Sequence, residues 1–262
     1  MSHKFELSVV VPGIRPENWM KLYTSLRDSI GPHAWEVIFV GPYFPPEEVT
    51  DNPNVKYLMD SGSPSRAFQM GSLLCEGELI CFGTDDAIAQ PNALHECIEL
   101  CQADEDCETI IITSYVEGIN VYGEQHKQHF SEASWHAGYH AGLRLPNVDP
   151  KWFIGLPLMN KDLYDELGGL DCRYEHINLN IYKMLFHAQV SGSRVSVSPN
   201  FVYHVDFDPS RDPNSDPILL AGAYDYELFK QDFHAPLEMG SPRPYDIHNW
   251  KQAPSIWKRR HQ

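Results

Sequence analysis

The chain has 262 residues, which at about 150 residues per domain corresponds to one large domain or two closely joined ones. Its 36 Asp and Glu residues outnumber 20 Lys and Arg residues and give a net charge of −16, which excludes general binding to nucleic acid or to an anionic membrane. Hydrophobic residues make up 42% of the chain, enough to form a core, so disorder of the whole chain is also excluded.

The sequence carries no pattern of export or membrane insertion. The first residues pass from polar MSHK into a strand-like run, unlike a signal peptide, and no window approaches about 18 consecutive apolar residues. Six cysteines are too few for a disulfide scaffold, so we expect reduced and mostly buried thiols. We therefore expect a cytoplasmic protein without a transmembrane segment. The closing WKRRH predicts a solvated tail or a peripheral contact with an anionic surface.

Strand and helix patterns alternate through the first 114 residues, as in a parallel sheet with helical crossovers. Ser63 and Pro64 have the residue types of an N-cap and first helical position. Gly31 and Gly77 follow two of the helical patterns. The patterns predict strands over 7–11, 36–40, 55–59, 78–82 and 109–113, and helices over 17–30, 65–75 and 92–103. These elements indicate half of a doubly wound α/β sheet.

The alternation is weaker after residue 114. We expect strands over 119–122, 156–159, 195–198 and 201–205, and helices over 161–167 and 177–187. Residues 206–262 hold seven of the 20 prolines, which predicts an irregular C-terminal arm packed on the body of the protein or on a partner. We therefore divide the chain into a domain over 1–205, with halves at 1–114 and 115–205, and the arm over 206–262.

Two adjacent carboxylates follow the strand predicted over 78–82. In open α/β sheets, ligands bind outside the carboxyl ends of the strands, and Asp85 and Asp86 come directly after this one. Such a pair is suited to hold a divalent cation, which in turn binds and polarises a diphosphate. The alternative is that both side chains form a turn and cap the helix that begins near Pro91.

Several motifs, taken together in order, resemble the family 2 inverting glycosyltransferases of GT-A fold. The chain has VVVP at the end of its first strand, Arg66 on a helix with a Gly five residues later, and the acidic segment CEGELICFGTDDAI. GGLDCRYEHINL over 168–179 is similar to the family's acceptor-side segment, and His204 in FVYHVD falls where many members have a metal-binding His. The resemblance covers about residues 7–205.

The resemblance implies an α/β fold of GT-A type, with a central mixed, mostly parallel sheet flanked by helices. It implies a hexosyltransferase-type enzyme that moves a sugar from a nucleotide-diphosphate donor to a hydroxyl of a glycan or other acceptor, with inversion, as in polysaccharide biosynthesis. It also implies dependence on Mn²⁺ or Mg²⁺. The oligomeric state, the sugar and the nucleotide are not specified by these motifs.

The resemblance also assigns roles to individual residues. Asp86 is expected as the main metal ligand and His204 as a further one. The segment 156–159 is expected beneath the sugar. The remaining positions are expected to contact the nucleotide: Pro12, Gly13 and Arg15 at the base and ribose, Arg66 as a positioning residue, and Thr84 and Asp85 beside the metal ligand.

The chain departs from the family pattern at three places. Thr84 replaces the first Asp of the acidic motif, so either the Thr84 hydroxyl or Asp85 must contact the ribose. Gly41 and Pro42 stand where the second strand of family members commonly ends in Asp, which leaves nucleotide choice open. Glu175 and His176 stand at the position of the family's acidic pair.

An inverting transfer needs a base that accepts the proton of the acceptor hydroxyl as the new bond forms. A carboxylate or a neutral imidazole serves near pH 7, and we favour Glu175 over His176. The alternative is that Glu175 only begins the helix over 177–187 as a first-turn acid, with His176 at the surface.

Two clusters of metal-ligating residue types have simpler interpretations. His126, His129, His136 and His140 are spaced as in some zinc sites, but we favour a mobile acceptor-binding segment with Trp135 and Tyr139, or an exposed loop. Cys97 and Cys101 lie one helical turn apart on an apolar face, which predicts core packing.

Two alternatives to a glycosyltransferase remain. Because of the replaced acidic residues, one alternative is a non-catalytic protein of the same fold that binds a glycan or serves as a scaffold. A nucleotidyltransferase on a similar sheet would need a Gly-rich basic loop after the first strand, where PGIRP supplies one Gly and one Arg.

Overall fold

The computed structural model describes residues 3–117, 133–134, 151–152, 155–205, 221–222 and 225–229. Its centre is an eight-stranded sheet in the order β3-β2-β1-β4-β9-β6-β10-β5, and β7 and β8 form a separate two-stranded sheet. The strands are β1 (Phe5–Pro12), β2 (Trp35–Gly41), β3 (Val55–Met59), β4 (Gly77–Phe82), β5 (Ala87–Ala89), β6 (Thr109–Glu117), β7 (Ala133–Ser134), β8 (Lys151–Trp152), β9 (Leu156–Asn160) and β10 (Arg194–Val205).

The sheet is mixed and mostly parallel, as predicted. β3, β2, β1 and β4 run parallel to one another, and β10 is parallel to β6. β9 is antiparallel to both β4 and β6, between which it lies, and β5 is antiparallel to β10. The predicted half-sheet is therefore interrupted, because a strand from later in the chain separates β4 from β6.

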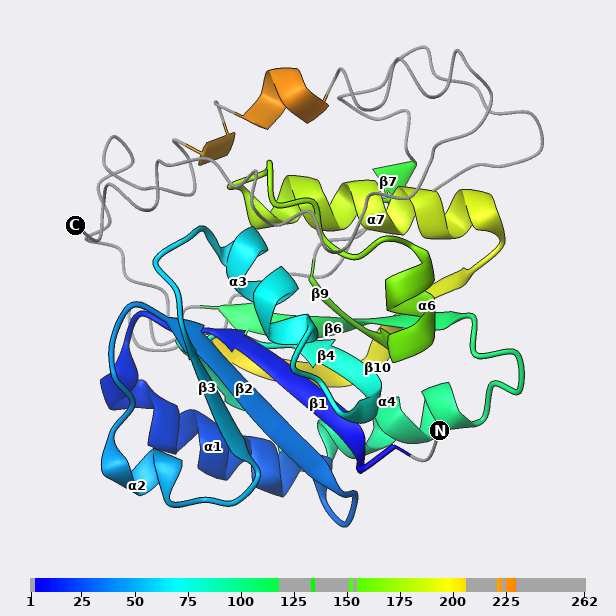
Figure 1. Cartoon of the computed structure of the whole chain (residues 1–262). Coiled ribbons are helices and arrows are strands. Elements are labelled where there is room, and N and C mark those ends of the chain that lie inside the picture. Colours follow the sequence, from blue (N-terminus) through cyan, green and yellow to red (C-terminus); the bar gives the residue numbers. More distant parts are fainter. Residues whose placement is uncertain are drawn as a thin grey trace.

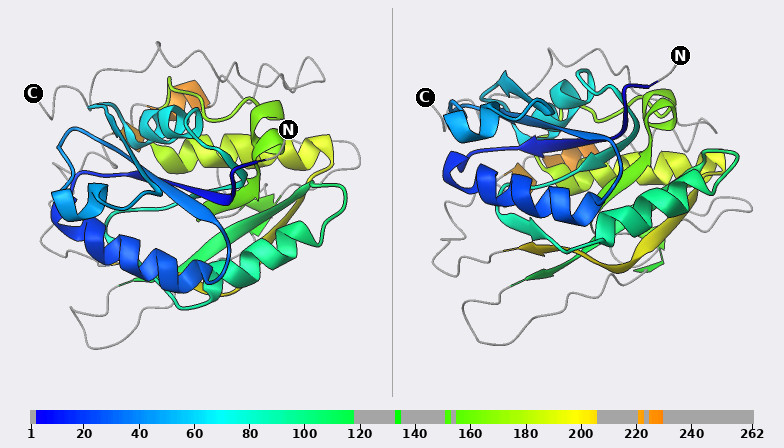
Figure 2. Two further views of the ribbon diagram at one scale, coloured as in Figure 1. Left: turned by 60° about the horizontal axis from the view of Figure 1, so that its bottom comes forward. Right: turned by 90° about the horizontal axis from the view of Figure 1, so that it is seen from below.

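Helices cover both faces of the sheet (Figures 1 and 2). α1 and α4 pack on one face, and α3, α6 and α7 on the other. On the first face the ring of Trp19 stacks on Phe39 with centroids 4.5 Å apart. On the second face Phe82 packs against Phe68 and Tyr164. The helices are α1 (Pro16–Ile30), α2 (Glu47–Thr50), α3 (Pro64–Ser72), α4 (Ala93–Gln102), α6 (Lys161–Glu166) and α7 (Ile177–Ser191).

The predicted start of α3 is confirmed. The side chain of Ser63 accepts a hydrogen bond from the backbone N–H of Arg66, and Pro64 is the first helical residue. The first N–H groups of a helix lack intrahelical acceptors, and proline at the first position has no N–H group to satisfy. This cap and the preset φ of proline therefore favour initiation here.

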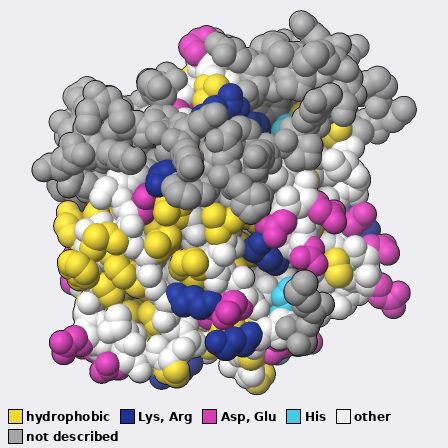
Figure 3. All heavy atoms as spheres, viewed as in Figure 1, with side chains coloured by type: hydrophobic (Ala, Val, Ile, Leu, Met, Phe, Trp, Pro, Cys, Tyr) yellow, Lys and Arg dark blue, Asp and Glu magenta, His cyan; other side chains and the backbone are white. Residues whose placement is uncertain are grey.

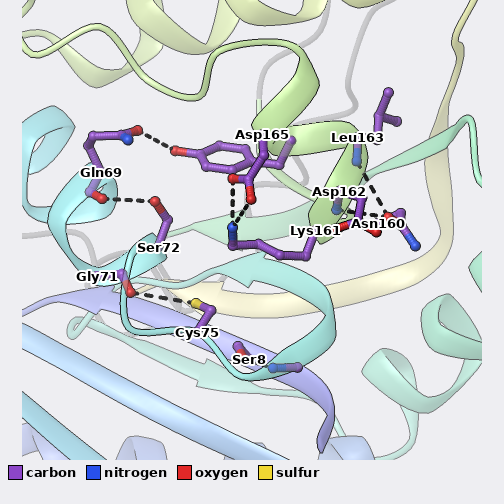
Figure 4. A network of polar contacts seen from close by, with 12 residues as sticks. Ser8, Gln69, Gly71, Ser72, Cys75, Asn160, Lys161, Asp162, Leu163 and Asp165 are labelled. Atoms are coloured by element: carbon purple, nitrogen blue, oxygen red, sulfur yellow. Dashed lines mark hydrogen bonds and ion pairs between the residues drawn. The ribbon is translucent and has the colours of Figure 1, made fainter. Parts of the chain in front are cut away.

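A buried amide ties α3 to α6 (Figure 4) and also to the segment before α7. The side-chain oxygen of Gln69 accepts hydrogen bonds from the Tyr164 hydroxyl at 2.7 Å and from the backbone N–H of Leu170 at 2.8 Å. Because a buried acceptor of this kind is costly to leave unpaired, the link fixes the path of the chain that leads from α6 towards α7.

The structure differs from the predicted elements in three ways. α2 and β5 were not predicted, since four and three residues are too few to show a period. The strands predicted over 195–198 and 201–205 are one strand, β10, with a register shift between Val197 and Phe201. The predicted strand over 119–122, and most of 115–150 and 206–262, lie outside the described residues. Within the described residues, no helix is long and apolar enough to cross a membrane.

Candidate functional site

A cavity of about 290 Å³ lies at the carboxyl ends of β1, β2 and β4. The chain leaves β1 towards β2 on one side, whereas β4 lies on the other, so the cavity occupies the switch point where ligands bind in open α/β sheets. The residues of its wall that the sequence predicted at the site are Pro12, Gly13, Arg15, Thr84, Asp85, Asp86 and Leu156, the first residue of the segment 156–159.

Asp85 joins the end of β4 to the loop after β1. One carboxylate oxygen accepts the backbone N–H groups of Ile14 at 2.7 Å and Arg15 at 2.6 Å, and the other lies 2.6 Å from the Arg15 guanidinium. The side chain is only 2% exposed. Burial raises the pKa of Asp85 above its ordinary value, because desolvation outweighs the charge of Arg15 and the two N–H groups.

The sequence predicted that Asp85 helps to hold a cation or caps the following helix, and these contacts show a different role. Both of its oxygens hold the loop over 14–15, and it does not cap α4, which begins at Ala93 after Asn92. The cap alternative is therefore wrong for Asp85. The loop over 14–15 forms part of the cavity wall, so the contacts of Asp85 with this loop help to shape the cavity.

Asp86 is the more accessible of the two carboxylates, with 22% of its side chain exposed. One oxygen accepts a hydrogen bond from the Thr84 hydroxyl at 2.5 Å, and the other lies 3.5 Å from the Arg15 guanidinium. Thr84 therefore orients the carboxylate that follows it, and Arg15 balances part of the charge of the pair.

Gly41, where the family pattern has Asp, is required by a close approach of two backbones. A Cβ at this position would lie 1.8 Å from the carbonyl oxygen of Gly13. The N–H of Gly13 donates to the carbonyl of Val40 at 2.8 Å, which brings the loop after β1 against the end of β2. Only glycine fits here, so the departure at Gly41 has a steric cause.

Asp60 is a wall residue that the sequence reasoning missed. It follows β3 and accepts hydrogen bonds from the Arg66 side chain at 2.9 and 3.0 Å and from the backbone N–H of Gly62 at 2.7 Å. Asp60 lines the cavity, whereas Arg66, which bonds to it, is not among the described lining residues. The sequence could have indicated Asp60, because it is an acidic residue that follows a predicted strand, as Asp85 does. The other lining residues missed include Thr113, Tyr115, Asn178 and Tyr203.

Glu175 and His176 lie at the start of α7, beside the cavity-lining residues Ile177 and Asn178. The Glu175 side chain is fully buried, and neither residue is among the described lining residues. His176 is the N-cap, and its Nδ1 accepts the N–H of Leu179 at 3.4 Å. The role of either residue as base stays a prediction.

Asp225, which the sequence did not indicate, holds this segment in place. One carboxylate oxygen accepts the backbone N–H groups of Glu175 at 2.7 Å and His176 at 2.5 Å. Burial raises the pKa of Asp225 to about 6, although the two N–H groups oppose the rise. A residue far along the chain thus fixes the backbone of both candidate bases.

The remaining candidates lie elsewhere. Tyr203 and Val205 line the cavity, but His204 between them does not, since alternate residues of a strand point to opposite faces. Cys97 and Cys101 are buried in the core, as predicted. The histidine segment over 126–140, and WKRRH, lie outside the described residues.

Exposed apolar side chains follow or precede two cavity-lining residues along the chain, near the ends of β2 and β3. Tyr43 and Phe44, which follow the lining residue Pro42, are 47% and 78% exposed, and Met59 before Asp60 is 48% exposed. Hydrophobic side chains also gather towards the left of the face in Figure 3.

The sequence matches no protein-family model and no curated protein. Solved structures do match. TarS 1–349 of S. aureus in complex with UDP is 17% identical, with a TM-score of 0.56 over 78% of this chain and 61% of that one. TarS 1–349 with UDP-GlcNAc is 16% identical, with a TM-score of 0.53 over 80% and 61%.

A longer TarS structure gives a TM-score of 0.54 at 18% identity, over 78% of this chain and 37% of that one. The chain thus spans about three fifths of TarS 1–349 and a smaller part of the longer protein. At this level of identity the likeness concerns the fold. The chain has the GT-A-like fold that its sequence predicts.

Proposed function

We propose that this protein is a glycosyltransferase that moves a sugar from a nucleotide-diphosphate donor to an acceptor hydroxyl. The observation that carries the proposal is the cavity at the switch point of the sheet, with Asp86 accessible in its wall and Asp85 holding the adjoining loop. Support comes from TarS, a protein of the same fold that was solved with UDP and with UDP-GlcNAc.

The residues of the cavity fit Mn²⁺ or Mg²⁺ held together with the donor. Both oxygens of Asp85 are engaged by the loop over 14–15, which leaves Asp86 as the acidic-motif residue able to face a ligand. One or two carboxylates with phosphate oxygens and water are the usual surroundings of Mg²⁺ in proteins. Such a cation would offset the charge that builds on the diphosphate leaving group.

The chain's own residues would divide the remaining tasks. Arg15, whose guanidinium reaches both carboxylates, would keep the acidic pair oriented and add positive charge beside the diphosphate. Pro12 and Gly13 would contact the nucleotide. We propose inversion, with Glu175 or His176 accepting the proton of the attacking hydroxyl of a glycan.

Nucleotide binding tests the proposal directly. We expect UDP with Mn²⁺ to raise the melting temperature, since a ligand at 100 times its Kd adds about 2.7 kcal/mol. Asp86→Asn should abolish the Mn²⁺-dependent part of this rise while leaving the melting temperature of the free protein nearly unchanged. Asp106→Asn, at a side chain that is 76% exposed, is the matched control and should behave as the wild type. Equal stabilisation of all three proteins would contradict the role of Asp86.

Turnover distinguishes an enzyme from the alternative, a non-catalytic protein that binds a glycan. An enzyme should release free nucleotide from one of a panel of nucleotide sugars, faster when a glycan acceptor is added, and NMR of the product should show an inverted anomeric centre. Glu175→Gln and His176→Gln, made separately, identify the base by a fall in transfer of about 10²-fold. If the donor binds but no donor is consumed with any acceptor, the non-catalytic function is the correct one.

A further inference from the structure

A second group of side chains that can bind a metal ion lies at the end of the sheet opposite the cavity. His33 lies in the loop before β2, and His95 and Glu99 lie one turn apart on α4. Since β1 and β2 are parallel and carry the cavity at their carboxyl ends, this group lies at the amino ends. α1, which leads to His33, and α4 lie side by side beneath the sheet (Figure 2).

The three side chains converge on one point. His33 Nε2 lies 2.8 Å from His95 Nδ1 and 3.5 Å from a carboxylate oxygen of Glu99. One ligand atom from each residue lies within 4.8 Å of the other two. The His33 ring is held firmly, with 7% of its side chain exposed, whereas the Glu99 side chain is 60% exposed and can adjust its position.

A fourth residue orients His33 in the manner of a metal-bound imidazole. Glu6 lies on the far side of the ring, with Oε1 2.9 Å from Nδ1, and its other oxygen accepts the backbone N–H of Ala34 at 2.8 Å. A carboxylate on the second nitrogen is the usual partner of a metal-ligating histidine, because it places the proton on Nδ1 and turns the Nε2 lone pair outward. Here that lone pair faces His95 and Glu99.

We propose that His33, His95 and Glu99 form a zinc site, with Glu6 as the residue that positions His33. Two imidazole nitrogens and one carboxylate are a donor set that Zn²⁺ takes with water in its fourth position. Mg²⁺ and Mn²⁺ prefer oxygen donors, so the site is chemically distinct from the one proposed at Asp86. Ligands of tetrahedral zinc lie about 3.3 Å apart, so the two rings need to separate by only about 0.5 Å.

The site would join three parts of the fold. Glu6 belongs to β1, His33 to the loop before β2, and His95 and Glu99 to α4. A bound cation that links these elements stabilises the folded chain, because the unfolded chain does not hold the ligands together. Zinc should therefore raise the melting temperature as well as bind.

The test is titration of the full chain, freed of metal by a chelator, with Zn²⁺ in calorimetry and with Co²⁺ in visible absorption. We expect one tight zinc site and the absorption of tetrahedral Co²⁺. His95→Gln and Glu99→Gln should each weaken this site by more than about 100-fold, and Glu6→Gln by about 10- to 100-fold. His126→Gln and Asp86→Asn are the controls and should leave it unchanged.

Thermal unfolding in chelator shows whether each variant is folded, and Glu99→Gln alters a side chain exposed enough to leave the fold intact. Equal zinc affinity and stoichiometry in the wild type, His95→Gln and Glu99→Gln would overturn the proposal. So would tight zinc binding that His126→Gln alone removes, since the metal would then reside in the segment over 126–140.

Discussion

Asp85 and Asp86 are adjacent in the sequence but differ in their contacts: Asp85 holds the loop over 14–15, whereas Asp86 is accessible in the cavity wall. The sequence located both, because acidic residues directly after a buried strand must lie at the ligand-binding edge of the sheet. The resemblance assigned the metal to Asp86 and the nucleotide to Asp85, but the pattern of residues alone could not separate their roles. The contacts of Asp85 depend on the loop over 14–15, about seventy positions earlier, whose N–H groups meet this carboxylate and not that of Asp86. The roles of Glu175 and His204 depend on similar long-range placement.

Removing the Asp85 carboxylate should destabilise the protein. Asp85→Ala leaves the partly buried N–H groups of Ile14 and Arg15 without their acceptor, and the loss of an acceptor costs about 1–3 kcal/mol where the group is buried. We expect the free energy of unfolding in urea to fall by about 2–3 kcal/mol, and UDP binding to weaken because the loop is released. Unchanged unfolding of Asp85→Ala would show that the loop does not depend on this residue.

Gly41→Ala should damage the cavity by sterics alone. The added methyl group would lie 1.8 Å from the Gly13 carbonyl oxygen, a backbone atom that cannot move without the loop. We expect a loss of about 3 kcal/mol in the free energy of unfolding together with loss of UDP binding. In Gly192→Ala the new Cβ meets no atom within 4 Å, and only the left-handed φ of 106° costs about 1–2 kcal/mol. That control should keep UDP binding, and equal effects of the two variants on UDP binding would contradict the steric account.

At the scale of elements, most helices and strands of the first 114 residues could be predicted because they have clear periods and capping residues. Ser63 with Pro64 at α3 and Gly31 after α1 are examples. The insertion of β9 between β4 and β6 could not be predicted, since pairing between strands far apart in the chain leaves no local signal. α2 and β5 are too short to have one.

α7 depends on a buried ion pair that a matched pair of variants can isolate. Lys183 on α7 lies 2.7 Å from Asp171, whose side chain is 1% exposed, and Arg173 also contacts this carboxylate. Although burial opposes it, these partners hold the pKa of Asp171 below its usual value. Lys183→Met leaves the buried Asp171 carboxylate with one cationic partner fewer. We expect the free energy of unfolding in urea to fall by about 2–3 kcal/mol.

Lys161→Met is the control for this change. Lys161 makes an equally close contact with Asp165, but that carboxylate is 43% exposed. A pair of this kind, four residues apart on a helix surface, contributes about 0.3–0.5 kcal/mol. If the two lysine variants lost equal stability, burial of the carboxylate would not be the cause.

At the scale of the whole molecule, sites are assembled from segments that the sequence keeps far apart. Asp225 holds Glu175 and His176 from about fifty positions away, and the group of His33, His95, Glu99 and Glu6 joins a strand, a loop and a helix. None of these residues shares a motif with its partners. The sequence therefore indicated the fold and one edge of the sheet better than it indicated these groups.

The raised pKa of Asp225 predicts a specific pH dependence. The unfolded carboxyl loses its proton near its ordinary pKa of about 3.9, whereas the folded one keeps it up to about 6, so between these values the folded state binds more protons. The contribution of Asp225 to stability therefore falls as pH rises from about 4 to 6, by up to about 3 kcal/mol. Asp225→Asn keeps an oxygen for both N–H groups but does not titrate.

Urea unfolding of the wild type and Asp225→Asn at several pH values measures this contribution as a difference between the two proteins. The other carboxyl groups act equally in both and cancel. We expect the stability of Asp225→Asn relative to the wild type to increase as pH rises from about 4 to 6. A difference that stays constant across this range would show that Asp225 titrates normally in the folded chain.

The proposed function requires that the cavity between the loop after β1 and the end of β4 binds the donor. A crystal structure of the protein with Mn²⁺ and a uridine diphosphate sugar tests it most directly. We expect the diphosphate in this cavity with the cation on Asp86, and Asp85 still bonded to the backbone of Ile14 and Arg15. Donor bound elsewhere, or a cavity that stays empty while Asp86 keeps its contact with Thr84, would contradict it.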